Sequence, residues 1–258
     1  MSETPRLDAE LLMAEALGVK REQLLLRALD GKAPDRFEAL VERRLAHEPI
    51  AYILGRRDFW TIDVGVGPGV LVPRPDSETL IEAAVEYFRN RPPQSILDLG
   101  TGPGTLLLAA LDQWPAARGV GIDRSESALS YARGNARRLG LADRAEFRIG
   151  NWGEGLDGRF DLVLCNPPYV ARDAALPVDV ARWEPADALF AGPDGLDDYR
   201  RLAPRLAPLL SSGGIACLEI GAGQHAAVTK LFAVNGFTIS SRIDLKGIVR
   251  CLVLRIDR

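Results

Sequence analysis

From Ser95 onward, short apolar runs alternate with stretches of helical periodicity, and this alternation restricts the possible folds more than any other feature. Strand-like runs occupy residues 95–99, 119–123, 145–149, 160–165, 214–220, 236–243 and 249–255. Helical patterns occupy residues 105–113, 125–139, 198–210 and 224–235. Such alternation predicts an α/β fold with a mostly parallel sheet covered by helices on both faces. Only residues 244–247 separate the last two strands, too few for a crossover, so that pair should be antiparallel.

The first part of the chain has a different pattern. Residues 1–55 contain only helical periodicity, which predicts a bundle too small to bury a large core by itself. Between Phe59 and Val72, β-branched residues are interrupted by glycines, which predicts a hairpin within a linker at 56–75. Asp76-Ser77 should then cap a helix that runs to about Asn90 and opens the main domain, 76–258.

A glycine-rich loop follows the first predicted strand of the main domain. It contains Gly100, Thr101, Gly102, Pro103 and Gly104. A strand, a glycine loop and a helix form a nucleotide-binding layout, but Thr105 stands where the NAD fingerprint needs glycine, and no P-loop lysine follows. The tight loop instead suits S-adenosylmethionine, which has no pyrophosphate. Pro103 removes one N–H and stiffens the loop. Asp98 should either neutralise the cofactor's amino group or accept N–H bonds from the loop.

The next predicted strand ends in a carboxylate, Asp123. It lies about 20 residues after the glycines, the spacing at which dinucleotide-binding folds place an acid on the ribose hydroxyls. S-adenosylmethionine has the same ribose diol. The alternative is that Asp123 caps the following helix, but Ser125 can do that itself. We therefore predict that Asp123 binds ribose.

The segment Asn166-Pro167-Pro168-Tyr169 directly follows the predicted strand 160–165. Asn166 has an amide oxygen, and the two prolines have carbonyls without N–H groups, so the segment mainly presents acceptors. Tyr169 offers a flat face. Two acceptors can hold both hydrogens of a planar NH2 group and direct its lone pair. The alternative is a simple proline-rich turn.

Together these motifs resemble the HemK/PrmC family, the protein-(glutamine) methyltransferases of peptide-chain release factors. The resemblance covers nearly the whole chain, at residues 49–55, 59–60, 70–78, 98–104, 123, 151–152, 166–169, 188–196 and 218–221. Asn-Pro-Pro-Tyr alone is shared with enzymes that methylate exocyclic amines of nucleic-acid bases. The upstream segments Tyr52-Ile53-Leu54-Gly55 and Pro73–Glu78 are what narrow the match.

The resemblance implies a class I S-adenosylmethionine-dependent methyltransferase with a seven-stranded sheet and a helical N-terminal domain that recognises the substrate. The methyl acceptor would be the side-chain amide nitrogen, N(5), of glutamine in the Gly-Gly-Gln motif of a release factor. Asn166 and the Pro167 carbonyl would accept its two N–H bonds beside the cofactor, with Pro168 completing the pocket and Tyr169 packing on the amide.

Two further sets of residues take their roles from the family. The resemblance implies that Trp152 packs on adenine; the alternative is a core aromatic. Arg74, Asp76 and Glu78 belong to the family's linker motif, and they would either support the pocket entrance or cap a helix.

Composition narrows the biological setting. The net charge is −3 and no Lys/Arg-rich block occurs, which weighs against direct nucleic-acid binding. Three dispersed cysteines indicate reduced thiols, two distant histidines predict no metal site, and no apolar segment is long enough to cross a bilayer. We expect a cytoplasmic monomer. Two rival hypotheses are a nucleic-acid amino-methyltransferase acting on adenine or guanine, and a cofactor-binding module without enzymatic activity.

Overall fold

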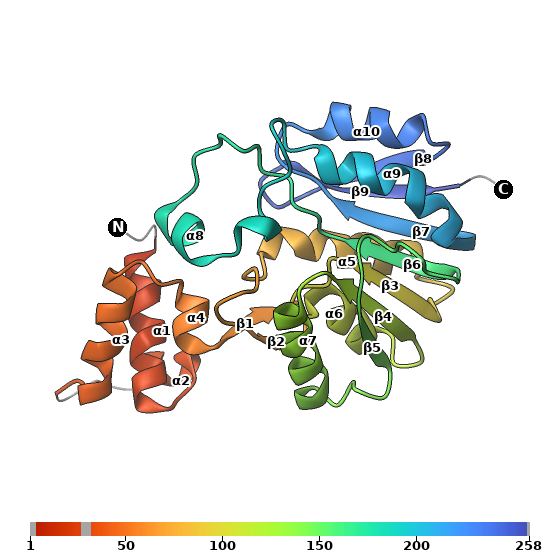
Figure 1. Cartoon of the computed structure of the whole chain (residues 1–258). Helices are drawn as coiled ribbons and strands as arrows, with labels where there is room; N and C mark the ends of the chain where they lie inside the picture. Colours follow the sequence, from red (N-terminus) through yellow and green to blue (C-terminus); the bar gives the residue numbers. More distant parts are fainter. Residues whose placement is uncertain (1–3, 27–31, 257–258) are drawn as a thin grey trace.

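The computed structural model describes residues 4–26 and 32–256, which form a small helical bundle beside a larger sheet domain (Figure 1). The bundle contains α1 (Pro5–Leu17), α2 (Arg21–Leu25), α3 (Asp35–Leu45) and α4 (Ile50–Leu54). Gly18 ends α1 in the left-handed conformation, with φ of 65°, which glycine adopts without strain. The bundle buries only a few large side chains, Leu12, Leu40 and Ile53 among them, so its core is as small as expected.

A hairpin of β1 (Arg56–Phe59) and β2 (Ile62–Gly65) joins the two parts. It lies earlier than the prediction for residues 59–72, because the chain turns at Trp60 rather than at the glycines. Trp60 adopts φ of 54°, and its N–H donates to the Glu78 carboxylate at 2.9 Å. The turn is therefore held by a tertiary contact. Gly67 serves close packing instead, because a Cβ there would lie 2.3 Å from the Tyr131 hydroxyl.

The main domain contains a seven-stranded sheet in the order β5-β4-β3-β6-β7-β9-β8. Its strands are β3 (Ser95–Leu99), β4 (Arg118–Asp123), β5 (Ala145–Ile149), β6 (Phe160–Cys165), β7 (Leu210–Glu219), β8 (Thr238–Ile243) and β9 (Val249–Arg255). The strands from β5 to β7 in this order pair in parallel, whereas β9 runs antiparallel to both of its neighbours. The prediction of a mostly parallel sheet with an antiparallel last pair is confirmed.

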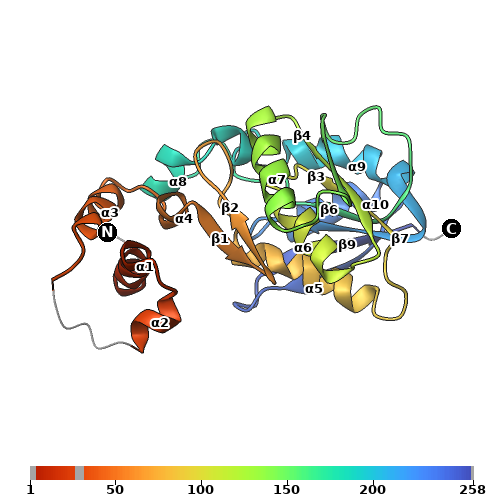
Figure 2. The same cartoon turned by 90° about the horizontal axis from the view of Figure 1, so that it is seen from below.

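Helices cover both faces of this sheet (Figure 2). One face carries α5 (Glu78–Tyr87), α6 (Thr105–Gln113) and α7 (Glu126–Arg138), and the other carries α9 (Asp197–Leu209) and α10 (His225–Ala233). Alternate residues of each strand serve the two cores: Leu164 belongs to the first, and its neighbours Val163 and Cys165 belong to the second. Burial on both faces explains why these strands are continuously apolar.

The start of α5 differs from the prediction. A 3₁₀ turn over Pro75–Ser77 precedes the helix, and Ser77 has helical dihedral angles with no side-chain capping bond. Asp76 forms an ion pair with Arg250 at 3.1 Å instead of capping the helix. The helix ends at Tyr87, before the expected Asn90.

The connection from β6 to α9 contains two elements that the sequence patterns did not predict. These are α8 (Val178–Trp183) and a 3₁₀ turn, η2 (Ala186–Ala188). In Figure 1, α8 extends from the sheet domain towards the N-terminal bundle, and an ion pair of 3.7 Å joins Asp179 of α8 to Arg44 of α3. This connection therefore bridges the two parts of the chain above the carboxyl end of the sheet.

Candidate functional site

The carboxyl ends of β3, β4, β5 and β6 converge on a cavity of about 370 Å³. The chain order reverses direction between β3 and β6, and ligands bind at such switch points in open α/β sheets. Eight of the predicted site residues line this cavity: Gly100, Thr101, Gly102, Pro103, Asp123, Trp152, Asn166 and Pro168. The topology thus brings together residues that three crossover connections separate in sequence.

The glycine loop folds back onto the neighbouring strand. The N–H groups of Gly100 and Thr101 donate to the Ile122 carbonyl at 2.8 and 2.9 Å, and the Gly102 N–H donates to the Asp123 carboxylate at 2.9 Å. Gly100 has φ of 71°, a conformation that residues with side chains rarely adopt. The Pro103 carbonyl accepts a bond of 2.8 Å from the buried Asn135 side chain, so the proline is fixed rather than mobile. These bonds hold the loop in shape without help from a ligand.

Asp98 lies at the bottom of the cavity and is 1% exposed. Its Oδ2 accepts bonds from the Thr101 hydroxyl at 2.6 Å and the Leu107 N–H at 3.2 Å. Its Oδ1 is buried, and no described residue donates to it. Burial raises the pKa of Asp98 to about 7, against the opposing effect of these two bonds. One oxygen therefore serves the loop, and the other is free for a cationic ligand group, so both predicted roles are compatible.

Asp123 is less free than predicted. Ser125 does cap α7, by accepting the Ala128 N–H at 3.2 Å. However, Asp123 Oδ1 also accepts the Ser125 N–H at 2.9 Å, while its Oδ2 holds Gly102. Each carboxylate oxygen has a second lone pair, so Asp123 can still accept a hydroxyl from the cavity that it lines.

Trp152 lines the cavity next to the glycine loop and adopts φ of 48°. Its indole N–H donates to the Asp198 carboxylate at 3.1 Å, which fixes the ring. A Cβ at Gly100 would come within 3.2 Å of this ring, so only glycine lets the loop pass so close to the indole. Trp152 therefore lines the cavity and also packs against the core on the α9 and α10 side of the sheet, so its position is compatible with both alternatives.

Asn166 has its amide group in a defined orientation. Its Nδ2 donates to the Ser77 hydroxyl at 3.0 Å. No described residue hydrogen-bonds its Oδ1, and the residue lines the cavity. The acceptor that the sequence predicts is therefore available to a ligand. Pattern reasoning had assigned Ser77 to a helix cap and missed this contact, because nothing in the sequence links positions 77 and 166.

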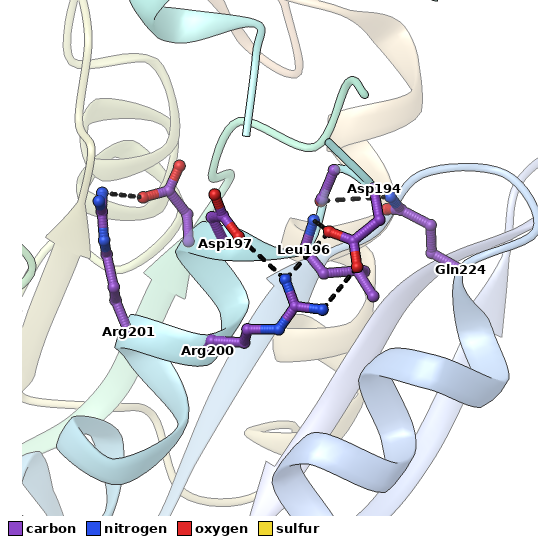
Figure 3. A network of polar contacts seen from close by, with 8 residues as sticks. Asp194, Leu196, Asp197, Arg200, Arg201 and Gln224 are labelled. Carbon is purple, nitrogen blue, oxygen red and sulfur yellow. Dashed lines mark hydrogen bonds and ion pairs between the residues drawn. The ribbon is translucent and has the colours of Figure 1, made fainter. Parts of the chain in front are cut away.

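Gly104, Pro167 and Tyr169 are not among the residues that line the cavity in the described structure. Gly104 immediately precedes α6, Pro167 is buried, and the Tyr169 hydroxyl donates to the Glu219 carboxylate at 3.2 Å. Gln224 donates to the Tyr169 carbonyl at 3.0 Å, and Figure 3 places Gln224 beside the start of α9. The tyrosine thus anchors its segment to β7.

Two carboxylates near the site were not predicted to function there. Glu219 belongs to β7 and is 1% exposed, and Glu184 follows α8. Glu184 binds Arg74 at 2.6 Å and accepts the Val72 N–H at 3.1 Å. Burying a carboxylate costs free energy, so a glutamate at the end of an apolar strand is unusual. The pair Leu218-Glu219 could therefore have identified Glu219 as a candidate functional residue.

The linker motif divides between two roles. Arg74 lines the cavity, as expected for a residue at its entrance. Glu78 instead accepts the Trp60 N–H and so holds the hairpin turn. Like Asp76, which pairs with Arg250, it is not among the residues that line the cavity.

The charges around the cavity suit a cationic ligand. Four carboxylates line it, Asp98, Asp123, Asp187 and Asp198, against two arginines. Both arginines are already paired, Arg74 with Glu184 and Arg124 with Asp187 at 3.3 Å. S-adenosylmethionine has a positive sulfur and an ammonium group, so the unpartnered Asp98 oxygen and the surplus of carboxylates fit this cofactor.

The part of the chain at 4–26 and 32–256 contains no group of three or more His, Cys, Asp or Glu side chains placed to hold a metal ion. Over the same residues, none of the helices has the length and apolar character needed to cross a bilayer.

Comparison with known proteins identifies the family. Residues 1–55 match the PrmC N-terminal domain, and residues 91–218 match a methyltransferase domain family. The release factor glutamine methyltransferase of Rhodospirillum rubrum is 43% identical over 98% of this chain and 79% of its own length. That of Caulobacter vibrioides is 42% identical over 91% of this chain and 83% of its own.

Solved structures share the fold at low sequence identity. The ribosomal protein L11 methylase of Lactobacillus delbrueckii subsp. bulgaricus is 20% identical, with a TM-score of 0.54, covering 74% of this chain and 84% of that one. The hMettl16 catalytic domain, solved with an RNA hairpin, is 14% identical, with a TM-score of 0.62, covering 81% and 82%. These two support the fold alone. The two curated relatives, matched along nearly the whole chain, place this protein in the release factor glutamine methyltransferase family.

Proposed function

We propose that the chain transfers a methyl group from S-adenosylmethionine to the side-chain amide nitrogen of a glutamine in a peptide-chain release factor. Membership of the family confirms the prediction of an S-adenosylmethionine-dependent glutamine methyltransferase. The observation that carries the assignment of roles is the state of Asn166. One N–H of its amide donates to Ser77, whereas its oxygen has no partner among the described residues, which supports the oxygen as the acceptor for a ligand in the cavity.

The residues around the cavity divide the binding of S-adenosylmethionine among them. The buried Asp98 carboxylate would hold the ammonium group, Asp123 the ribose hydroxyls and Trp152 the adenine ring. When bound, the cofactor supplies a methyl group attached to a cationic sulfur. The neutral thioether that is left after methyl transfer is a good leaving group.

Asn166 and Pro167 would hold the other reactant. The Asn166 Oδ1 and the Pro167 carbonyl accept hydrogen bonds from the two N–H groups of the glutamine amide. The nitrogen lone pair takes no part in these bonds and is left to attack the methyl group. Orientation of this kind can supply several kcal/mol of the barrier, up to about 7–11 kcal/mol in ideal cases. The same two oxygens bind more strongly as the nitrogen gains positive charge, so they stabilise the transition state more than the bound substrate.

No strong base is required from the protein, because a methylated amidium loses its proton readily. Burial raises the pKa of the Tyr169 hydroxyl, and Glu219 accepts its hydrogen, so Tyr169 stays neutral at physiological pH. Its part in the proposal is to hold Asn166 and Pro167 in place from the β7 side.

The surroundings of the site fit a protein substrate. The connection from β6 to α9 lines the cavity at Pro185, Asp187 and Ala188, and its helix α8 is joined to the N-terminal bundle by the ion pair of Arg44 and Asp179. We propose that these elements grip the release factor. The chain would act as a cytoplasmic monomer without binding nucleic acid directly, which agrees with its net charge of −3.

The proposal is tested by offering labelled S-adenosylmethionine to the protein with three acceptors. These are a release factor, the same factor with the glutamine of its Gly-Gly-Gln motif replaced, and nucleic acid. Label on the intact factor that disappears with the replaced glutamine supports the proposal. Label on nucleic acid alone would establish the amino-methyltransferase alternative, and no label on any acceptor would favour a binding module.

A further inference from the structure

The segment from Asn166 to Tyr169 is stiff between its two ends. Pro167 and Pro168 have fixed φ angles, and each proline also restricts the backbone of the residue before it. One end of the segment continues β6, and the other end is Tyr169. A stiff segment moves as a unit, so whatever fixes Tyr169 also helps to place the Asn166 side chain and the Pro167 carbonyl.

Gln224 holds the main chain of Tyr169. The residue is half-buried just before α10, and Figure 3 shows its side chain reaching towards the start of α9. Its Nε2 donates to the Tyr169 carbonyl at 3.0 Å and to the Gly195 carbonyl at 3.3 Å, and its Oε1 accepts the Gly221 N–H at 3.0 Å. The side chain makes no capping bond to α10, so the helix does not explain these contacts.

The partners of the Gln224 amide fix its orientation. Backbone carbonyls only accept hydrogen bonds, and a backbone N–H only donates. Rotation of the amide by 180° would place its oxygen against two carbonyl oxygens and its NH2 group against the Gly221 N–H. In the observed orientation the amide links three backbone segments, which are the end of the Asn166–Tyr169 segment, the turn before α9 and the loop after β7.

Two glycines leave room for this arrangement. A Cβ at Gly221 would lie 2.6 Å from Gln224 Oε1 and 3.0 Å from the Tyr169 ring. A Cβ at Gly195 would lie 2.3 Å from the Tyr169 carbonyl oxygen and 2.9 Å from Gln224 Nε2, and Gly195 also has φ of 73°. Both backbone segments therefore pass too close to Gln224 and Tyr169 for a side chain to fit.

We propose that Gln224 is a positioning residue for methyl transfer. By fixing the Tyr169 carbonyl, it keeps Asn166 Oδ1 and the Pro167 carbonyl where the acceptor amide binds. Glu219 holds the hydroxyl of the same tyrosine, so Tyr169 is fixed at both its side chain and its main chain. This inference rests on the proposed function of Asn166.

Steady-state kinetics test the proposal with Gln224→Met, which keeps the length of the side chain and removes its amide. kcat should fall about 10- to 100-fold, because a small misplacement of substrate-holding groups costs that much. KM for the release factor and Kd for S-adenosylmethionine should stay within about threefold, since orientation rather than binding is lost. The matched control is Gln94→Met, at an exposed residue before β3 whose side chain bonds to the Pro92 carbonyl, and it should leave kcat unchanged.

Hydrogen exchange measured by mass spectrometry reads the segment without turnover. The N–H groups of residues 170 and 172, which follow Tyr169, form backbone bonds of 2.9 Å to residues 189–192. Peptides across residues 166–172 should exchange at least about threefold faster in Gln224→Met, because the carbonyl anchor is lost. The same peptides should keep their wild-type rates in Gln94→Met.

Gln224→Glu adds a pH profile that a general loss of stability would not produce. At pH 8 an ionised carboxylate would face two carbonyl oxygens, so kcat should be low. At pH 6 the introduced carboxyl can take up a proton and donate it to one of them, so the ratio of its kcat to the wild-type value should rise at least about threefold. Burial raises the pKa of the nearby Glu219 to about 7, but Glu219 is present in both proteins, so the ratio isolates the introduced carboxyl. In Gln94→Glu the ratio should not change with pH.

Gly221→Ala is the second variant, useful if Gln224→Met folds poorly. Its methyl group would displace the Gln224 amide, so kcat should fall. The double variant should stay within about threefold of the larger single loss, because both changes act on one amide. Gly134→Ala is the control, because its Cβ would meet nothing within 4 Å, and it should keep wild-type kcat.

Wild-type kcat in both Gln224→Met and Gly221→Ala would overturn the inference, as would a kcat ratio of Gln224→Glu that does not change with pH. If Asn166→Ala abolishes transfer while the Gln224 variants are fully active, only this inference fails. If Asn166→Ala is itself fully active, the proposed role of Asn166 fails.

Discussion

The two sides of the cavity are built in different ways. On the cofactor side the fixing bonds are local: Asp98 binds groups three and nine residues away, and Gly102 binds a carboxylate 21 residues away. On the acceptor side they are distant. Asn166 is held by a serine 89 residues earlier, and Tyr169 by a carboxylate 50 residues later. The contacts of Asp98 and Gly102 lie within one strand–helix–strand unit, although Trp152 is held by Asp198, 46 residues later. The acceptor side, by contrast, exists only when β6 and β7 have packed on α5.

This difference predicts separable functions. Substitutions on the cofactor side should change affinity for S-adenosylmethionine with little effect on how the substrate amide is oriented. Substitutions on the acceptor side should do the reverse. Each of the following variants tests whether the two sides are as independent as their contacts indicate.

The largest effect is expected from Asn166→Ala. Removal of the amide oxygen leaves the substrate nitrogen without its orienting acceptor, so methyl transfer to the release factor should fall at least about 1000-fold. Affinity for S-adenosylmethionine should stay within about tenfold, because the bonds that shape the glycine loop do not involve position 166. Label transfer and calorimetric titration measure the two quantities.

Asn235→Ala is a matched control, because Asn235 is exposed just after the end of α10 and its side chain bonds only to Leu231 of that helix. It should keep wild-type transfer and affinity. Loss of cofactor binding in Asn166→Ala in parallel with activity would contradict the separation of the two sides.

The second effect concerns Asp98→Asn. Replacing the carboxylate removes the charge proposed to hold the ammonium group, and such charged hydrogen bonds contribute about 1.5–3 kcal/mol. Affinity for S-adenosylmethionine should therefore fall roughly 10- to 100-fold by calorimetry. Once S-adenosylmethionine is saturating, kcat should remain close to the wild-type value. Asp112→Asn, an exposed carboxylate on α6, should change neither quantity. A kcat reduced as strongly as the affinity would show that the two sides are coupled.

The raised pKa of Asp98 predicts in which direction stability and cofactor affinity change with pH. Its pKa is about 7 in the folded protein against an ordinary value of 3.8, so between these values the folded state binds more protons than the unfolded state. The contribution of Asp98 to the free energy of unfolding therefore falls as pH rises from about 4 to 7. Denaturation of the cofactor-free protein at pH 5 and pH 8 should show a smaller fall for Asp98→Asn than for wild type. Wild-type affinity for S-adenosylmethionine should in turn weaken below about pH 7, because the neutral carboxyl cannot pair with the ammonium group.

The locality of the contacts also explains what the sequence could predict. Helix α6 starts and ends where its pattern predicts, at Thr105 and Gln113, because the glycine loop and apolar periodicity act over short distances. Most strands were predicted to within two residues for the same reason, although β7 begins four residues earlier than expected. The antiparallel last pair followed from chain length alone, since a short turn cannot make a crossover.

The features that the sequence did not predict depend on contacts between residues that are far apart in the chain. The hairpin turns at Trp60 because Glu78 holds its N–H, so the glycines further along mislead a search for turn residues. Serine commonly caps helices, but the Ser77 hydroxyl accepts a hydrogen bond from Asn166 instead. The short helix α8 has only six residues and none of them is fully buried, although Trp183 packs against the core, so it is too short for helical periodicity to be detected. Its place is set by contacts such as Arg44 with Asp179.

The smallest effect is expected where the two sides of the cavity meet. Arg124 follows β4 on the cofactor side, and it binds the carbonyl of Asp187 at 2.8 Å and its carboxylate at 3.3 Å in the connection that begins at Asn166. Both side chains line the cavity, yet they are 57% and 85% exposed. Exposed pairs of this kind contribute about 0.2–1 kcal/mol. Arg124→Ala should therefore speed dissociation of S-adenosylmethionine by up to roughly fivefold in stopped-flow measurements.

The matched control is Arg133→Ala, which breaks an exposed ion pair with Glu126 on α7, away from the residues that line the cavity. It should leave the dissociation rate unchanged. The Arg124→Ala rate should also approach the wild-type rate at high salt, because ions screen an exposed pair. A rate in Arg124→Ala that equals that of Arg133→Ala would mean that the β6–α9 connection does not retain the cofactor. An increase well beyond tenfold would mean that this single contact holds the two sides together, and that their independence is lost when it breaks.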